Sequence, residues 1–205
     1  MRRAYGDAGR GRPPDPLNRA LGLLLVDIDH FKRVNDAHGH DAGDAVICGT
    51  ADVLRRCVRL NDSVVRWGGE EFLLVARQAK PGFLPIVALR VLRRVRERPQ
   101  ALPAGNEVHV TCSVGWSFYP LAEEPGRQLD WRLVLKLADM GLYLAKRNGR
   151  NMAVGIVPGP RPLPEAGVEA IAADLEEAVR CGYLRIESSG PVLLSDAADA
   201  APGSV

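Results

Sequence analysis

The amino-acid sequence predicts an α/β fold, an α+β sandwich in which a mixed central sheet is flanked by helices. Short apolar runs with the length of strands alternate along the chain with longer segments whose apolar residues recur at helical spacing. The continuous apolar run Leu21–Val26 is typical of a strand that is buried on both faces. A chain of 205 residues has room for one such domain with an appendage.

The first elements can be assigned in order along the chain. Residues 1–20 are rich in Gly, Pro and Arg, so we expect a disordered lead-in or a truncated N-terminal segment. After the first strand we expect a short helix over His30–Asp36, which the Asp29 side chain can cap. Glycines then precede a longer helix, expected over Asp44–Leu60.

The remaining elements follow from the same two patterns. Strands are expected at Ser63–Trp67, Phe72–Ala76, Val108–Phe118, Asn151–Val157 and Tyr183–Glu187. Helices are expected at 86–98, Leu133–Arg147 and Glu165–Arg180. Pro158–Pro164 has the composition of a linker, and the chain from about Ser188 has that of a disordered tail. We therefore expect a domain over residues 21–157 and an appendage over 158–205.

Composition excludes several classes of protein. The net charge is +2 and the basic residues are scattered, so nothing indicates a nucleic-acid partner. No signal peptide or run of the ~20 apolar residues needed for a membrane helix is present, and we expect the cytoplasm. The cysteines lack CxxC spacing and are expected to be buried thiols in a reducing compartment. They are Cys48, Cys57, Cys112 and Cys181.

The most unusual stretch is Arg66–Phe72, which reads RWGGEEF. A glycine pair between two apolar runs predicts a β-hairpin, because glycine can adopt the positive φ of a tight turn. Neighbouring side chains on extended backbone point to opposite faces, so one of Glu70 and Glu71 can face a ligand. A surface hairpin with solvated acids is the alternative interpretation.

Asp27 ends the first strand, and it reaches the same sheet edge as Glu70 if that strand pairs beside the hairpin. Two carboxylates and the Ile28 carbonyl form a hard oxygen site that suits Mg²⁺ carrying phosphates. Alternatively, Asp27 and Asp29 simply cap the next helix.

Phosphate-binding groups are available nearby. The N-terminus of the short helix offers free N–H groups, and Lys32 lies in its first turn. Lys146 and Arg150, near the end of a later helix, would add positive charge against a triphosphate, although cations there also suit the helix dipole alone. The chain has no GxxxxGK[ST] loop, which excludes a P-loop enzyme.

These motifs belong to a longer pattern that strongly resembles the GGDEF-domain diguanylate cyclases, in order and spacing, from Leu21 to Val157. The matching segments are Asp27–Lys32, Asn35-Asp36, Gly39-His40, Gly43-Asp44, Arg66–Phe72, Val110–Gly115, Ala138-Asp139, Leu142-Tyr143, Ala145-Lys146 and Gly149–Asn151. The family's usual N-terminal segment, DxLTGLxNRR and a long helix, is reduced here to a remnant at Asp15–Arg19.

The resemblance implies a palm-like nucleotide-cyclase fold, with the GGEEF sequence on a β-hairpin. It also implies the condensation of two GTP into cyclic di-GMP and two pyrophosphates, with Mg²⁺ or Mn²⁺ as cofactor. One domain would hold one GTP, so catalysis would require a homodimer.

The same resemblance assigns roles to individual residues. The implied metal ligands are Asp27, the Ile28 carbonyl, Glu70 and Glu71. The implied catalytic groups are Glu70 and Lys32. The implied substrate-binding residues are Phe31, Asn35, His40, Asp44, Gly68, Gly69, Lys146 and Arg150. An RxxD motif implies an inhibitory site for the product at Arg59, Asp62 and Arg90.

The guanine preference has a physical basis, because an ionised Asp44 can accept both the N1–H and the exocyclic amino group of guanine. Because the N-terminal segment is shortened, a second hypothesis stays open. In it, the domain is catalytically impaired and binds GTP or cyclic di-GMP as a sensor.

Overall fold

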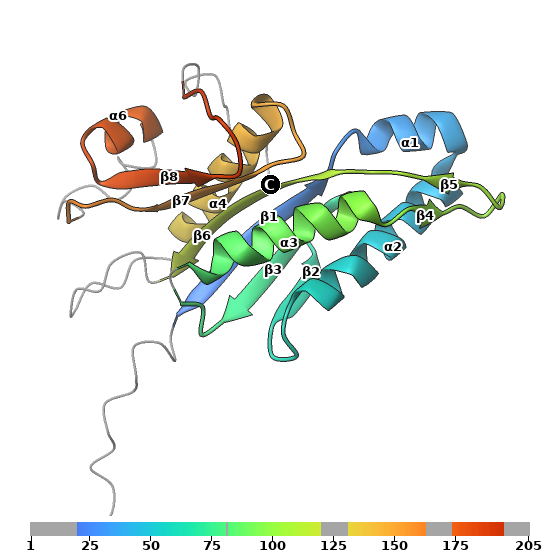
Figure 1. The fold of residues 1–205 in the computed structure, drawn as a ribbon, viewed down its shortest axis with the longest axis horizontal. Coiled ribbons are helices and arrows are strands. Elements are labelled where there is room, and N and C mark those ends of the chain that lie inside the picture. The colour runs from blue at the N-terminus through green and yellow to red at the C-terminus, as the bar shows by residue number, and fades with distance from the viewer. Residues whose placement is uncertain (1–19, 81, 120–130, 163–173, 195–205) are drawn as a thin grey trace, which may run out of the picture.

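The computed structural model describes residues 20–80, 82–119, 131–162 and 174–194. They form a six-stranded sheet of order β2-β3-β1-β6-β7-β8 and the helices that pack on it (Figure 1). The strands are β1 Leu21–Ile28, β2 Ser63–Arg66, β3 Glu71–Arg77, β6 Cys112–Tyr119, β7 Ala153–Pro158 and β8 Leu184–Ser188. β6 and β7 are parallel, and the other neighbouring pairs are antiparallel. The predictions for residues 1–19, 163–173 and 195–205 lie outside the described residues.

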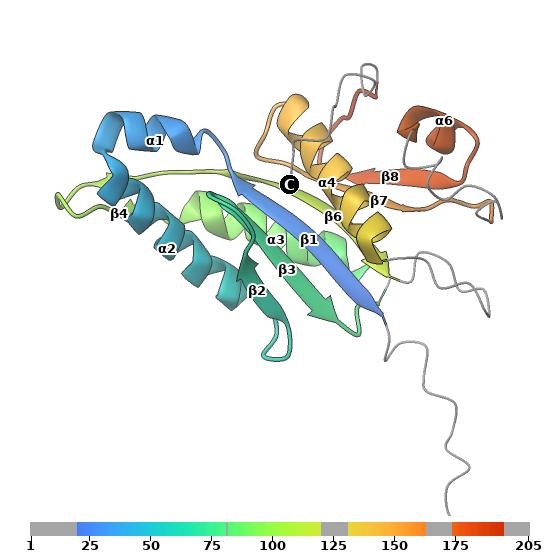
Figure 2. The same ribbon diagram turned by 180° about the vertical axis from the view of Figure 1, so that it is seen from behind.

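Helices cover both faces of the sheet, which confirms the predicted fold class. The described helices are α1 Phe31–His38, α2 His40–Cys57, α3 Phe83–Glu97, α4 Trp131–Arg147 and α6 Leu175–Arg180. α2 and α3 lie on one face and α4 on the other (Figures 1 and 2). Along β1, Leu24 and Val26 pack with α2 and α3, while Leu23 and Leu25 pack with α4. Burial on both faces explains why the first strand is a continuous apolar run.

α4 packs directly on β6 because Gly115 has no side chain. A Cβ at this position would lie 2.0 Å from the Ala138 carbonyl oxygen and 2.1 Å from the Leu142 nitrogen, far inside van der Waals contact. The close approach fixes the C-terminal end of α4, which carries Lys146, against the sheet.

Two differences between the predicted and the observed element boundaries bear on the site. The expected continuous strand over Val108–Phe118 is wrong: β6 begins at Cys112, opposite Ile28 at the end of β1. Val108 lies beyond the end of β1 and pairs in a separate small sheet, between β4 Gln100–Ala101 and β5 Glu107–Val108. The long helix begins at His40 because Gly39 supplies the positive-φ junction, φ 84°.

The cysteine prediction is partly wrong. Cys57 and Cys112 are buried, whereas Cys48 is exposed and Cys181 is partly exposed. Cys48 lies on the solvent-facing side of α2, and Cys181 follows α6 with its thiol 3.0 Å from a carboxylate oxygen of Glu177. Spacing alone does not distinguish buried from exposed thiols.

The C-terminal part of the described chain extends the sheet. β8 pairs antiparallel with β7, and Leu184 packs in the same core as α4 with 1% of its surface exposed. Although composition predicted a disordered tail from about Ser188, the Ser189 N–H donates to the Ala153 carbonyl at 3.0 Å. The Leu193 N–H likewise donates to Oδ1 of Asn148 at 2.8 Å.

Among the described helices, none has the length and hydropathy that crossing a bilayer would require.

We predict that Leu184→Ala lowers the free energy of unfolding by about 2–4 kcal/mol, because it opens a cavity between β8 and α4. Leu193→Ala is the matched control: its side chain is 74% exposed, and the expected change is within about 0.5 kcal/mol. Urea denaturation of both variants measures the difference. Equal stabilities of the two variants would show that β8 is not part of the cooperative unit.

Candidate functional site

The end of β1 and the acidic hairpin lie side by side. Asp27 pairs across the strands with Glu71, and the Ile28 N–H donates to the Glu70 carbonyl at 3.4 Å. The first strand thus pairs beside the hairpin, which was the condition for Asp27 and Glu70 to reach the same edge of the sheet. Three carboxylates, those of Asp27, Glu70 and Glu71, interact electrostatically there.

Asp27 is the most perturbed acid of this edge. The pKa of its carboxyl is raised from 3.8 to about 6, chiefly by burial and also by the nearby charges of Glu70 and Glu71. A hydrogen bond from Lys146 Nζ, 2.7 Å from Asp27 Oδ2, acts in the opposite direction. Asp27 therefore neither caps a helix nor is solvated, and Lys146 is its counter-ion.

The chemistry of these donors suits a divalent cation. Carboxylate and carbonyl oxygens are the ligands that Mg²⁺ prefers, and a cation here would relieve the repulsion that raises the pKa of Asp27. Within the described residues, no three His, Cys, Asp or Glu side chains are already grouped as a metal would require. The donor set therefore fits a metal that arrives together with phosphate oxygens.

The Asp29 side chain has a different structural role from the predicted one. The N-terminus of α1 has no side-chain cap, so the prediction that Asp29 caps this helix is wrong. Its buried carboxylate instead accepts from Thr111 Oγ1 at 2.6 Å, Ser113 Oγ at 2.7 Å and the Asn151 N–H at 2.9 Å. Sequence reasoning missed this role, because a capping residue and a long-range anchor look the same before a helix.

The backbone near Asp29 is held in an uncommon conformation. The φ angle is positive at His30, directly after Asp29, where it is 57°. It is also positive at Arg150 and Asn151, at 60° and 45°, where the Asn151 N–H donates to Asp29. Non-glycine residues with positive φ persist where surrounding contacts hold them. The Asp29 hydrogen bonds supply such contacts on both sides of the site.

Two side chains of α1 pack against Gly43 where α1 meets α2. Phe31 is buried, and Asn35 Oδ1 is buried without a hydrogen-bond partner among the described residues. A Cβ at Gly43 would lie 1.9 Å from that oxygen and 3.0 Å from the Phe31 ring, so only glycine leaves room for these two side chains. Asp44 follows on α2 and is exposed. The structure thus brings Phe31, Asn35 and Asp44 to one end of the α1–α2 pair, where Asn35 retains an unused acceptor.

The other two predicted residues of α1 and α2 are less constrained. Lys32, in the first turn of α1, and His40, at the start of α2, are both exposed. Among the described residues, neither side chain has a hydrogen-bond or ion-pair partner that would define a role.

The hairpin turn does not use the glycines as predicted. Neither Gly68 nor Gly69 has a positive φ, so the expectation that they adopt the positive φ of a tight turn is wrong. The Trp67 and Gly68 N–H groups instead donate to the Glu71 carbonyl, at 2.8 and 3.3 Å. A Cβ at Gly69 would meet nothing within 4 Å. Gly69 therefore leaves open backbone at the turn, whereas a Cβ at Gly68 would lie 3.0 Å from a carboxylate oxygen of Glu71.

The side chain of Arg66 stabilises this turn. Its Nε and Nη2 donate to the Gly69 carbonyl at 3.1 and 2.9 Å. The contact links the strand before the turn to the Gly69 carbonyl within it.

Lys146 and Arg150 enter the site from the end of α4. Lys146 reaches Asp27 as described, so it does more than offset the helix dipole. Arg150 is exposed in the loop that follows, and its N–H donates to the Ala145 carbonyl at 3.0 Å.

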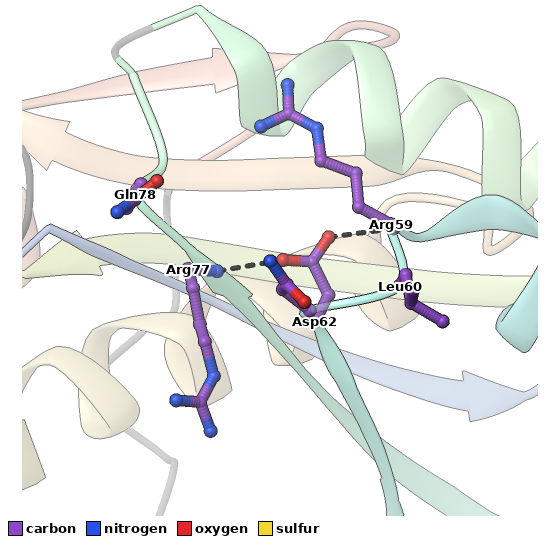
Figure 3. Close-up of a pocket in the computed structure, with 6 residues that line it drawn as sticks. Arg59, Leu60, Asp62, Arg77 and Gln78 are labelled. Atoms are coloured by element: carbon purple, nitrogen blue, oxygen red, sulfur yellow. Dashed lines mark hydrogen bonds between the residues drawn. The ribbon is translucent and has the colours of Figure 1, made fainter.

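The RxxD motif lines a separate open pocket of about 560 Å³ (Figure 3). Asp62 accepts the backbone N–H groups of Arg59 and Arg77, both at 2.9 Å. The Arg59 side chain points away from Asp62 toward α3, where its guanidinium lies 4.0 Å from the centre of the Phe83 ring. Arg90 is not part of the pocket lining, because its Nη1 donates to the Cys57 carbonyl at 3.0 Å. Sequence reasoning did not name Arg77 and Gln78, which also line the pocket.

We predict that Asp27→Asn raises the free energy of unfolding at pH 7 by about 1–3 kcal/mol in metal-free buffer, because a pKa unit corresponds to about 1.4 kcal/mol. The folded-state pKa of about 6 exceeds the ordinary value of 3.8, so the folded protein holds this proton more tightly. Wild-type stability therefore falls, relative to the variant, as the pH rises from about 4 to about 6. The favourable contact with Lys146 is already included in this net shift of the pKa.

Urea denaturation between pH 4 and pH 7 in the presence of EDTA measures this difference. Asp36→Asn, an exposed acid on α1, is the matched control and should show no such pH dependence. A variant that is less stable than wild type at pH 7 would contradict the electrostatic account.

Comparisons with known proteins agree with this geometry. The family model described as "Diguanylate cyclase, GGDEF domain" matches residues 15–152. Diguanylate cyclase A of Treponema denticola is 36% identical over 131 residues, which are 64% of this chain and 34% of that protein. Probable diguanylate cyclase DgcC of Escherichia coli is 37% identical over 134 residues, 65% of this chain and 34% of that protein. The chain thus spans about a third of the length of these curated relatives.

Solved structures show the same fold. The active GGEEF domain of a diguanylate cyclase from Vibrio cholerae is 32% identical, with a TM-score of 0.57 over 66% of this chain and 81% of that one. The GGDEF domain of DgcB from Caulobacter crescentus, solved in complex with c-di-GMP, is 30% identical, with a TM-score of 0.57 over 64% and 75%. The shared edge of acids, the glycine hairpin and these similarities together show that the chain belongs to the GGDEF-domain family of diguanylate cyclases.

Proposed function

We propose that this domain is a diguanylate cyclase that condenses two GTP into cyclic di-GMP and releases two pyrophosphates. The observation that carries the proposal is the convergence of Asp27 with the acids of the hairpin, beside Lys146. This is the arrangement that a triphosphate bound with a divalent cation requires.

GTP would be bound from two sides. The α1 and α2 residues around Gly43 would bind the guanine, with Phe31 against the ring, Asn35 and Asp44 on its polar edge, and His40 nearby. The triphosphate would lie over the backbone of Gly68 and Gly69. Its negative charge would be balanced by the cations of α1 and of the α4 end, which are Lys32, Lys146 and Arg150.

The proposed metal is Mg²⁺ or Mn²⁺, held by Asp27, the Ile28 carbonyl and Glu70, with Glu71 assisting. When bound, it would activate the 3′-hydroxyl and offset charge on the leaving pyrophosphate. In this site, Lys146 would exchange its contact with Asp27 for a phosphate oxygen.

The reaction follows from these positions. The 3′-hydroxyl of one GTP attacks the α-phosphorus of the other, and the bond from that phosphorus to the pyrophosphate oxygen breaks. Glu70 accepts the hydroxyl proton, and Lys32 stabilises the negative charge that develops on the phosphates. A second, equivalent attack closes the ring. Because each domain would hold a single GTP, two copies of the domain must face each other, and we propose a homodimer as the active state.

We further propose that the RxxD pocket binds cyclic di-GMP and inhibits the enzyme. Arg59 and Asp62 lie in one open pocket, as such a site requires. For product to bind, Arg59 would leave the Phe83 ring and Arg90 would leave the Cys57 carbonyl. The same pocket favours the second candidate function, a sensor that binds the dinucleotide without turnover.

Incubation with GTP and Mg²⁺, followed by chromatography for cyclic di-GMP, tests the proposal. Glu70→Gln should lower the rate by at least about a hundredfold, because a general base contributes about 10²–10⁴-fold. Glu107→Gln, an exposed acid in the small sheet, should retain the wild-type rate. Cyclic di-GMP binding without turnover by the wild type, lost in Arg59→Ala, would instead establish the sensor. No binding of either nucleotide would overturn both functions.

We predict that Gly43→Ala weakens GTP binding about tenfold or more, because its methyl group displaces the Asn35 side chain and a lost polar pairing costs about 1–3 kcal/mol. Asn35→Ala removes the atom that the methyl group would meet, so Gly43→Ala should add little in that background. Isothermal titration with 3′-deoxy-GTP measures all four proteins of the cycle. Full additivity of the two substitutions would show that the methyl group does not act through Asn35.

A further inference from the structure

A second pocket lies between the C-terminal half of α2 and the end of α3, which run side by side in Figures 1 and 2. Its volume is about 320 Å³, and it shares no lining residue with the RxxD pocket. The lining residues are Val53, Arg56, Arg94, Glu97, Arg98 and Pro99. Half of them are arginines, so the pocket has an excess of positive charge.

Arg98 is the unusual member of this set. Its Nη1 is buried and has no hydrogen-bond partner among the described residues. A buried donor on a charged group is costly when it is unpaired. The backbone holds this residue in place, because Gln100 Nε2 donates to the Arg98 carbonyl at 3.2 Å and packs against Gly49 of α2.

The dipoles of the two helices explain only part of the arrangement. Arg56 and Arg94 lie in the last turns of α2 and α3, where cations are favourable. Arg98 lies beyond the end of α3, and its buried Nη1 offsets no helix carbonyl. The single acid of the lining, Glu97, also lies 3.8 Å from Arg93, and one carboxylate against three arginines leaves the pocket with a net positive charge.

We propose that this pocket binds a small phosphate-bearing anion. Guanidinium groups donate paired hydrogen bonds that match phosphate oxygens, and Arg98 would supply the innermost donor. Val53 and Pro99 provide apolar contact for the remainder of the ligand. The volume lies at the lower end of the range of ligand pockets, which suits pyrophosphate or a small phosphate ester rather than a macromolecule.

Isothermal titration of the full chain at constant ionic strength tests the proposal. The probes are orthophosphate, pyrophosphate and ribose 5-phosphate, which distinguish an inorganic anion from a phosphate ester. Saturable binding of at least one probe is expected. Arg98→Gln and Arg56→Gln should each weaken it about tenfold or more, because a hydrogen bond to a charged group is lost.

One variant separates this site from other positive charge. Arg96→Gln removes an exposed arginine of α3 that does not line the pocket. It should bind the probe as wild type does. Equal weakening in Arg96→Gln, or the absence of saturable binding of any probe, would overturn the proposal. If Arg98→Gln does not fold by circular dichroism, the exposed Arg56→Gln decides the outcome.

Discussion

The buried Asp29 carboxylate is the contact on which the arrangement of the site depends. It joins the end of β1 to Thr111 and Ser113 of the β6 strand region and to Asn151 after α4. These three segments continue into α1, the sheet centre and the loop with Arg150. α1 and the cations at the end of α4 thus share one internal anchor. Because a buried charge must be fully hydrogen-bonded to be tolerated, its partners constrain one another.

The proposed reaction and the stability of the domain impose opposite demands on the acids. Asp27 lies in a buried place near two further carboxylates, and its raised pKa records the electrostatic cost of that position. Lys146 balances part of the charge at 2.7 Å, but a flexible ammonium can move to a phosphate when one is present. The site is therefore arranged for additional positive charge, as expected for a site that binds a metal–triphosphate complex.

Much of the fold was predictable because its main signals are local. The two-sided burial of β1 makes an apolar run, and the acids lie at the end of β1 and at the start of β3, next to turns that the sequence indicates. What could not be predicted depends on distant partners. A carboxylate before a helix indicates a cap, and only the structure shows that Asp29 binds Thr111 instead. Likewise, the pairing of β8 and the pocket at Arg98 depend on contacts between segments that are far apart in sequence.

The central claim is that Asp27 and Glu70 hold one divalent cation together with GTP. Electron paramagnetic resonance of Mn²⁺, titrated into the protein with 3′-deoxy-GTP, measures this directly and does not depend on turnover. The account predicts one bound Mn²⁺ per bound nucleotide, with affinity reduced about tenfold or more in both Asp27→Asn and Glu70→Gln. Wild-type Mn²⁺ affinity in both variants would contradict it.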